Sequence, residues 1–523
     1  MGGIVRPPYP GPTMHPSISG PTLADPPVAT LGAALERLAC RAGPWLTVHR
    51  GSASTAYTAG EVLMLARRWA RALQEAGVRP GDRAALLLPN DVAFVAAFFG
   101  CQYAGATPVP LAWPVSALDL GRTVAMLQPL VDHARPSVIV TTPGVVSLAP
   151  FGRPALAEPH ALPAGSQPAW SPEDTAFIQY TSGSLGRPRG ALISQRAAVA
   201  SAWSMAQALG VGPDDVGVSW LPLFHDMGLV GGLLCPLLAG FPVHLLAPGE
   251  FLLHPRRWLA CISEHRGTVA AAPDFAYALT ARRVANVDGL DLSTWRHALN
   301  GSEPVHRATI EAFVERFGPV GFSAEAPRPV YGLAENTLGV SFSAPGEPDL
   351  SAGDRTLVSA GRPLPGMDVA IADSGEVLVR GPTLMAGYFE DPEATGRALR
   401  DGWLHTGDLG CIADGRLYVT GREKDLVIQN GRKFHPYDIE RIAAAAVRAP
   451  PNGAAAFAAR DEELVVVVEA PGDGPVDVER LVRGELLASL GVRPHRVVSV
   501  TPGDLPRTTS GKLRRAACVE RYS

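Results

Sequence analysis

The chain has 523 residues, of which 46% are hydrophobic and 18% are charged. That length exceeds one ordinary hydrophobic core, so two or three domains are expected. The formal net charge of -4 excludes a global basic field of the kind that binds nucleic acid, and we predict no nucleic-acid partner. The six cysteines are scattered and form no Cys-x-x-Cys pair. We therefore expect neither a disulfide framework nor a zinc site, and a reducing cytoplasm fits this composition.

The chain opens with a segment that lacks the pattern of a packed element. Residues 1–27 are predicted to be a disordered leader, because Arg6–Pro27 is rich in proline, glycine and serine and has no apolar core of the signal-peptide type. Further on, Leu229–Leu246 is the most apolar stretch, but Pro236 and Pro242 interrupt it. A bilayer span needs roughly 20 nearly uninterrupted apolar residues, so this stretch predicts a buried helix followed by a strand, and no membrane span.

Helical and strand patterns alternate between residues 28 and 420. Apolar residues of Val62–Ala76 recur at helical spacing, and the following Arg83–Pro89 is an apolar run suited to a buried strand. This alternation indicates an α/β fold with largely parallel sheets, arranged as sandwiched α/β subdomains. The further predicted elements are helices Val92–Tyr103 and Leu118–Ala134, strands Ser137–Thr141 and Asp174–Gln179, helix Ala197–Leu209, strand Val216–Leu221, helix Gly228–Leu238 and strand Val243–Leu246.

From about Asp368 the predicted strands become shorter and are separated by turns. A small α+β unit is predicted over residues 421–523, and its size suits a separate domain. The predicted organisation is therefore a leader at 1–27, an N-terminal domain at 28–420 and a C-terminal domain at 421–523. The last predicted elements of the N-terminal domain are strands Val369–Ile371, Glu376–Arg380 and Leu417–Thr420. Those of the C-terminal domain are helix Pro436–Ala446, strands Ala454–Ala459 and Glu463–Glu469, helix Val476–Leu490 and strand Arg496–Val500.

A glycine-rich turn carries the first chemical signal. Tyr180–Gly190 reads Y-T-S-G-S-L-G-R-P-R-G, between an apolar strand pattern and a helical pattern. Small residues and hydroxyls on such a turn can direct backbone N–H groups at a phosphate. The spacing is neither that of a Walker A loop nor G-x-G-x-x-G. From these residues alone, a phosphate-binding loop and an ordinary polar loop both remain open.

This segment resembles the phosphate-binding loop of the acyl-adenylate-forming superfamily, and four further motifs follow in that family's order. They resemble the aromatic–acid motif, the ribose-binding motif, the hinge and the C-terminal lysine motif; these are Tyr331–Glu335, Thr406–Asp408, Gly421–Asp425 and Pro506–Lys512. Other segments resemble the fatty acyl-AMP ligases within that superfamily; these are Trp220–Leu229, Phe251–Trp258, Ala272–Tyr277 and Gly431–Glu440. That group makes acyl adenylates and passes the acyl chain to an acyl carrier protein.

The resemblance implies a catalytic set and a metal. Lys512 would bridge the substrate carboxylate and the α-phosphate of ATP, where an anion attacks a polyanion and needs a cation. His225 would lie where the carboxylate enters. Glu335 would ligate Mg²⁺, with Thr181 of the phosphate loop as a second ligand, since this hard ion prefers oxygen donors. The plain alternatives are a solvated lysine, a structural histidine and a surface glutamate.

The resemblance also implies a nucleotide-binding set. Asp408 would accept hydrogen bonds from both ribose hydroxyls, Arg422 would reach the ribose or a phosphate, and Tyr331 of the Tyr331-Gly332 pair would stack on adenine. An ordinary turn aspartate and a core tyrosine are the alternatives. The purine's other face would be lined by Gly301, Ser302 and Glu303, and the phosphates held by Thr181, Ser182, Gly183, Ser184, Gly186 and Arg189.

Two positions and one stretch depart from the family pattern. Leu185 stands where the phosphate loop usually has threonine, and Arg189 stands where it has lysine, so the loop loses a hydroxyl and exchanges an ammonium for a planar guanidinium. The stretch Asn336–Ala360 is short where fatty acyl-AMP ligases carry an insertion associated with the lack of coenzyme A activity.

The resemblance thus predicts ATP- and Mg²⁺-dependent activation of a carboxylic acid, most simply a fatty acid, in a secondary-metabolite pathway of the cytoplasm. The acyl group would pass to a stand-alone acyl carrier protein, because only eleven residues follow Lys512. A coenzyme A ligase for a fatty or aromatic acid is an alternative, and a non-catalytic nucleotide-binding relative is another. The C-terminal domain would act as a lid that hinges near Lys424 and swings away for acyl transfer.

Overall fold

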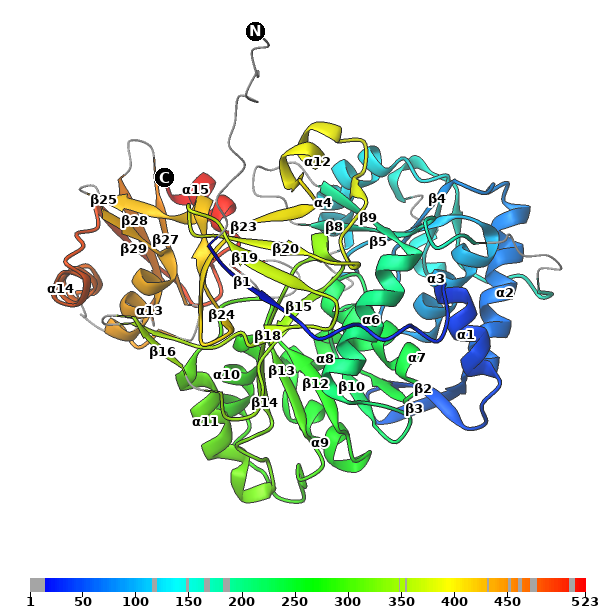
Figure 1. Ribbon diagram of the computed structural model, residues 1–523, viewed down its shortest axis with the longest axis horizontal. Helices are drawn as coiled ribbons and strands as arrows, with labels where there is room; N and C mark the ends of the chain where they lie inside the picture. The colour runs from blue at the N-terminus through cyan, green and yellow to red at the C-terminus, as the bar shows by residue number, and fades with distance from the viewer. Residues whose placement is uncertain are drawn as a thin grey trace, which may run out of the picture.

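The structure is a computed structural model that describes residues 15–114, 120–146, 150–163, 170–181, 189–347, 349–352, 355–429, 432–449, 453–459, 463–470, 477–507 and 513–523. A large body built from α-helices and sheets is followed by a smaller C-terminal region, drawn in orange and red in Figure 1. This arrangement confirms the predicted α/β class with a small α+β unit at the end of the chain.

The central sheet has nine strands among the described residues, in the order β18-β15-β14-β13-β12-β10-β11-β2-β3. The strands from β14 to β2 run parallel, whereas β15, β18 and β3 join antiparallel at the two edges. The strand bounds are β2 (Pro44–Arg50), β3 (Ala53–Thr58), β10 (Gly217–Ser219), β11 (Val243–Leu245), β12 (Val269–Ala272), β13 (His297–Asn300), β14 (Pro327–Gly332), β15 (Gly339–Phe342) and β18 (Arg362–Pro363).

A second layer holds the parallel sheet β5-β4-β6-β7 and the antiparallel sheet β21-β9-β8. Helix α2 (Ala59–Glu75) begins at a capping box formed by Thr58 and Glu61, and it packs on the almost wholly buried helix α3 (Val92–Ala104). A Cβ at Gly100 would lie 2.5 Å from the Cβ of Trp69, so only glycine permits this close helix contact. The strand bounds are β4 (Arg83–Leu86), β5 (Thr107–Pro110), β6 (Val138–Val140), β7 (Ala155–Leu156), β8 (Thr175–Thr181), β9 (Arg189–Ser194) and β21 (Gly387–Tyr388).

A further sheet contains part of the segment that was predicted to be a disordered leader. Strand β1 (His15–Ser19) pairs antiparallel with β19 (Asp368–Ile371), and the Gly20 amide donates to the Met367 carbonyl at 2.7 Å. The prediction of disorder over residues 1–27 is therefore wrong for residues 15–27, because their backbone groups find partners that lie far away in the sequence; residues 1–14 lie outside the described part. The sheet order is β1-β19-β20-β23-β22 with β24 on β23, using β20 (Glu376–Arg380), β22 (Leu399–Arg400), β23 (Trp403–Ala413) and β24 (Arg416–Arg422).

The C-terminal region has hydrophobic clusters of its own. Helices α13 (Pro436–Ala446) and α14 (Val478–Leu490) cover one face of the sheet β27-β28-β29, and α15 (Arg515–Tyr522) packs on the other. The predicted lid movement and the boundary at residue 421 remain predictions. The three strands are β27 (Ala454–Ala458), β28 (Leu464–Glu469) and β29 (Arg496–Val500), and a hairpin of β25 (Val427–Gln429) and β26 (Arg432–Phe434) precedes them.

The apolar stretch at Leu229–Leu246 folds inside the protein. It forms the π-helix η3 (Met227–Leu234), the short helix α7 (Cys235–Ala239) and the buried strand β11. Throughout the described ranges, no helix has the length and apolar character that crossing a membrane requires. A buried helix followed by a strand was predicted here; the π geometry was not.

Candidate active site

Tyr331, Asp408 and Arg422 come together where two sheets meet. Tyr331 lies near the end of β14, and Asp408 faces Arg422 across the β23–β24 hairpin. The Tyr331 hydroxyl donates to Asp408 Oδ2 at 2.7 Å, and Arg422 Nε lies 3.2 Å from Asp408 Oδ1. The three residues predicted to hold the ribose and adenine are therefore neighbours, although their roles remain predictions.

Burial controls the protonation of this group. Loss of water around the Asp408 carboxyl, which is only 6% exposed, raises its pKa, while Arg422 and Tyr331 act in the opposite direction. Burial and the Asp408 charge raise the pKa of Tyr331 well above its ordinary value, so the phenol keeps its proton and donates. The Asp408 charge raises the pKa of Arg422. The result is a buried acceptor with a permanent cation beside it.

Glu335 forms the neighbouring part of the cluster. It lies on the 3-10 turn η5 (Ala334–Asn336), which packs against β8, the strand that ends at Thr181. The Tyr388 hydroxyl donates to Glu335 Oε1 at 2.8 Å, and the Arg189 guanidinium lies 5.4 Å from the centre of the Tyr388 ring. Thr181 pairs with Arg189 across the β8–β9 ladder. Arg189, at one end of the predicted phosphate loop, thus lies over the tyrosine ring whose hydroxyl binds Glu335.

Several predicted site residues lie outside the described part of the chain. They are Ser182, Gly183, Ser184 and Gly186 of the loop, the unusual Leu185, and Lys512. Their proposed contacts with phosphate and carboxylate stay predictions.

Lys424 is a cation that sequence reasoning used only as a hinge marker. It lies on the turn η6 (Glu423–Asp425), directly after β24. Desolvation and the Arg422 charge lower the pKa of Lys424, with Asp425 and Asp408 opposing that shift, although much of the residue stays exposed. Its position in the Gly421–Asp425 motif, two residues beyond Arg422, is a sequence signal for a second cation near Asp408, in addition to the predicted hinge.

The Gly301–Glu303 segment follows β13 and is shaped by close packing. A Cβ at Gly301 would lie 2.7 Å from the Val330 carbonyl oxygen, and Ser302 has a φ of +73°. The Glu303 carboxylate accepts the Phe275 backbone N–H at 2.7 Å. Glu303 therefore anchors the start of helix α10 (Asp274–Arg283), and it is Ser302 that lines the space beside Tyr331.

His225 precedes the π-helix η3. Its Nδ1 lies 2.6 Å from Asp226 Oδ1, and the residue before it, Phe224, accepts a hydrogen bond from the Gln179 side chain at 2.9 Å. The ring is half-buried, and Asp226 next to it lines the cavity described below. The structure thus places His225 beside the cavity, as a carboxylate-entry residue would be, without testing that role.

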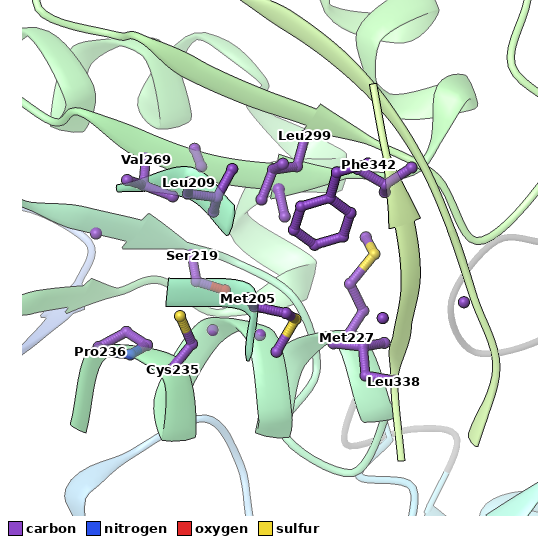
Figure 2. A pocket seen from close by; sticks show the side chains of 18 of the residues that line it. Met205, Leu209, Ser219, Met227, Cys235, Pro236, Val269, Leu299, Leu338 and Phe342 are labelled. Atoms are coloured by element: carbon purple, nitrogen blue, oxygen red, sulfur yellow. The ribbon is translucent and has the colours of Figure 1, made fainter. Parts of the chain in front are cut away.

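An apolar cavity runs from this cluster into the large body. Its empty space is about 820 Å³, including the part open to solvent. Tyr331, Gly332 and Ser302 line one part, and the rest lies between β10–β15 and helices α6 (Gln195–Leu209), η3 and α7. Figure 2 shows apolar side chains from both walls; those labelled include Met205, Leu209, Met227, Val269, Leu299, Leu338 and Phe342.

The π-helix gives the cavity one of its walls. Met227, Gly231 and Gly232 of η3 line it, and the two glycines place no side chain in the space. Single-turn π segments are often found at functional sites, because the wider turn shifts the side chains that follow. The wide turn and the glycines together leave this part of the wall without side chains at two positions.

Known proteins share this architecture. The sequence matches the AMP-binding enzyme family over residues 39–389, and the chain belongs to that family. Long-chain-fatty-acid–AMP ligase FadD26 of Mycobacterium marinum is 36% identical, and the alignment covers 85% of this chain and 87% of that protein. Medium-chain-fatty-acid–[acyl-carrier-protein] ligase JamA of Moorena producens is 33% identical, with 84% and 86% covered.

A solved structure from a study of fatty acyl-adenylate ligases of E. coli and L. pneumophila superposes with a TM-score of 0.88 at 34% identity, covering 95% of this chain and 98% of that chain. Within its family, the protein is an adenylate-forming ligase of the fatty acyl-AMP ligase type. The predicted resemblance is confirmed at both levels.

Proposed function

We propose that this protein activates a fatty acid with ATP and then transfers the acyl group to the thiol of a separate acyl carrier protein. In the first step a carboxylate oxygen attacks the α-phosphorus of ATP, giving acyl-AMP and pyrophosphate. In the second, the carrier thiol attacks the acyl carbon, AMP leaves and the thiol proton is released. The observation that carries the proposal is the apolar cavity that opens beside the Tyr331–Asp408–Arg422 cluster.

Some of these residues would bind the substrates, and others would supply positive charge to the phosphates. Asp408 would accept the ribose hydroxyls, which suits a buried carboxylate already held in place by Tyr331 and Arg422. Arg189, Arg422 and Lys424 would supply positive charge around the phosphates, and Lys512 would join the carboxylate to the α-phosphate. His225 would orient the incoming carboxylate at the mouth of the cavity.

A magnesium ion fits the same cluster. The Glu335 carboxylate and the Thr181 hydroxyl are oxygen donors on two elements that pack together, and hard cations prefer such donors. They would hold the ion, which when bound would neutralise charge on the ATP phosphates.

A carrier protein is proposed as the acceptor, since JamA is named for transfer to one and this chain resembles it over most of its length. The short stretch Asn336–Ala360 favours a second candidate, coenzyme A. Here the described residues form β15 and a small hairpin of β16 (Leu350–Ala352) and β17 (Arg355–Leu357). Both acceptors present the same thiol arm, so the difference must come from the rest of the molecule.

The test supplies ATP and fatty acids of graded length, with no acceptor, with coenzyme A, or with a phosphopantetheinyl carrier protein. Acid-dependent pyrophosphate release, with acyl-AMP seen by mass spectrometry in the absence of any acceptor, is expected. Acyl-carrier product should exceed acyl-CoA. Rapid acyl-CoA formation would replace the carrier by coenzyme A, and absence of acyl-AMP with every acid would refute the proposal.

A further inference from the structure

Three histidines and a cysteine meet on the far side of the central sheet. His49 comes from β2, His244 from β11, and Cys261 and His265 from the end of helix α9 (Arg256–Glu264) and the residue after it. Each offers one nitrogen or sulfur atom, and all four atoms lie within 4.8 Å of one another. His49 Nε2 is 3.0 Å from His244 Nδ1 and 3.7 Å from Cys261 Sγ.

These spacings are those of a metal site. Zinc binds histidine nitrogen at about 2.0–2.1 Å and thiolate sulfur at about 2.3 Å, so tetrahedral ligand atoms lie about 3.3–3.7 Å apart. The His49 ring centre is 5.3 Å from that of His244 and 5.2 Å from that of His265, which suits rings radiating from one point. The His244 and His265 rings are stacked 4.0 Å apart and would have to spread by about 1 Å on coordination.

We propose that His49, His244, Cys261 and His265 bind a structural Zn²⁺ ion. All four positions would be protein ligands, which is the arrangement of structural rather than catalytic zinc. Coordination replaces the S–H bond of Cys261 by a sulfur–zinc bond, and the thiol proton goes to solvent. The three imidazoles bind as neutral rings, and Glu250 and Glu264 near His49 supply negative charge around the ion.

The position of the site indicates what the ion would do. Val243 on β11 lines the apolar cavity, and His244 follows it on the same strand, so the two side chains leave opposite faces of the sheet. The site therefore lies behind the cavity wall and is separate from Glu335 and Thr181. An ion here would fasten β2 to β11 and α9, which come from a distant part of the sequence.

The cluster is accessible from solvent on one side. His49, His244 and His265 are half-buried while Cys261 is 6% exposed, so an ion can enter from solvent and finish in contact with a buried sulfur.

The experiment uses the full-length protein, stripped with a chelator and reconstituted with Zn²⁺ or Co²⁺ in separate samples. About one Zn²⁺ per chain should be retained after desalting, and Co²⁺ should give the visible bands of tetrahedral coordination with a sulfur-to-cobalt charge-transfer band. Cys261→Ser should abolish the charge-transfer band and weaken Zn²⁺ binding by more than the roughly 10–100-fold that loss of an outer-shell partner causes. Cys40→Ser and His254→Gln are matched controls, because both residues are exposed and outside the cluster.

Zinc should also raise the melting temperature of the stripped wild type and of both controls, but not that of Cys261→Ser. Circular dichroism of each variant without metal verifies that it is folded. Two results would overturn the proposal. One is a wild-type chain that retains no Zn²⁺ after reconstitution. The other is metal retention that is equal in Cys261→Ser, His244→Gln and the controls, which would make any bound ion adventitious.

Discussion

Replacing Gly231 by leucine should shorten the fatty acids that the protein accepts. Gly231 lies on the π-helix wall of the cavity, and a Cβ there would lie 3.2 Å from Leu338 Cδ2 on the facing wall. The rest of a leucine side chain must then enter the cavity or displace Leu338. Alanine, valine and leucine at this position form a series that fills the space in steps.

The magnitude follows from the carbon atoms displaced. A leucine side chain adds four carbons, and each methylene of the acid that loses its buried position costs about 0.8 kcal/mol. Long acids should therefore lose about 3 kcal/mol, or more than about 100-fold in kcat/KM, and the alanine variant about fourfold. Short acids that do not reach Gly231 should be unaffected. A leucine in place of glycine also favours helix, so the fold should be retained.

Pyrophosphate release is measured against acids of increasing length for the wild type and each variant. Gly484→Leu is the control, since Gly484 lies on the exposed face of helix α14 with nothing within 4 Å of its Cβ position. A loss that is equal for short and long acids would refute the reasoning, because it would show that Gly231 affects the chemistry and not the length of the cavity.

Three further predictions concern charge. Asp408→Asn should raise the KM for ATP roughly 10–150-fold, because losing a charged hydrogen bond costs about 1.5–3 kcal/mol. The KM for the acid should change little, and an effect on the KM for the acid alone would contradict the ribose role. Lys512→Ala should lower acid-dependent pyrophosphate release by some hundreds-fold with an unchanged melting temperature, and near-normal release would remove this lysine from the mechanism. Burial lowers the pKa of His297 to about 4, and the ring nitrogens of this 5% exposed residue have no hydrogen-bond partner in the described part of the chain. Unfolded histidine binds a proton below pH about 6.5. The contribution of neutral His297 to the free energy of unfolding is therefore complete above pH about 6.5. As the pH falls toward 4, up to about 3 kcal/mol of this contribution is lost. His297→Phe should lose less stability than the wild type between pH 6.5 and 4 in denaturant titrations, whereas the exposed-site control His495→Gln should follow the wild type.

Local patterns predicted the elements whose burial is periodic. The helix expected at Pro436–Ala446 and the strand at Arg496–Val500 have the predicted bounds. The helix places a regular apolar face on one core, and the valines of the strand pack on the clusters at its two faces. Strand β1 could not be found in this way. His15–Ser19 has no alternating apolar face, and it is a strand only because β19 supplies its hydrogen bonds.

The candidate site also has parts that the sequence predicts and parts that it does not. Motif order identified Tyr331, Asp408 and Arg422, and the structure brings them together. The cavity is assembled from segments far apart in the sequence, so no spacing along the chain predicts it. In the His49–His265 cluster, Cys261 and His265 are four residues apart on one helix end, but His49 comes from a distant strand. Three of the four segments that resembled fatty acyl-AMP ligases, Trp220–Leu229, Phe251–Trp258 and Ala272–Tyr277, meet in one aromatic core, where Trp220 stacks on Phe251 with ring centres 3.8 Å apart. They support the sheet that forms the cavity wall.

The pairing of β1 with β19 has a consequence for the order of folding. Ile18 pairs with Val369, about 350 residues further along the chain. At the synthesis rates of roughly 5–20 residues per second, β1 waits on the order of 20–70 s for its partner to leave the ribosome. The sheet that contains β1 also contains β23, and thus Asp408. The cluster of Tyr331, Asp408 and Arg422 is therefore completed late, after the central strands that line the cavity have already been made. A nascent chain halted before β19 would leave the backbone groups of β1 without their partners.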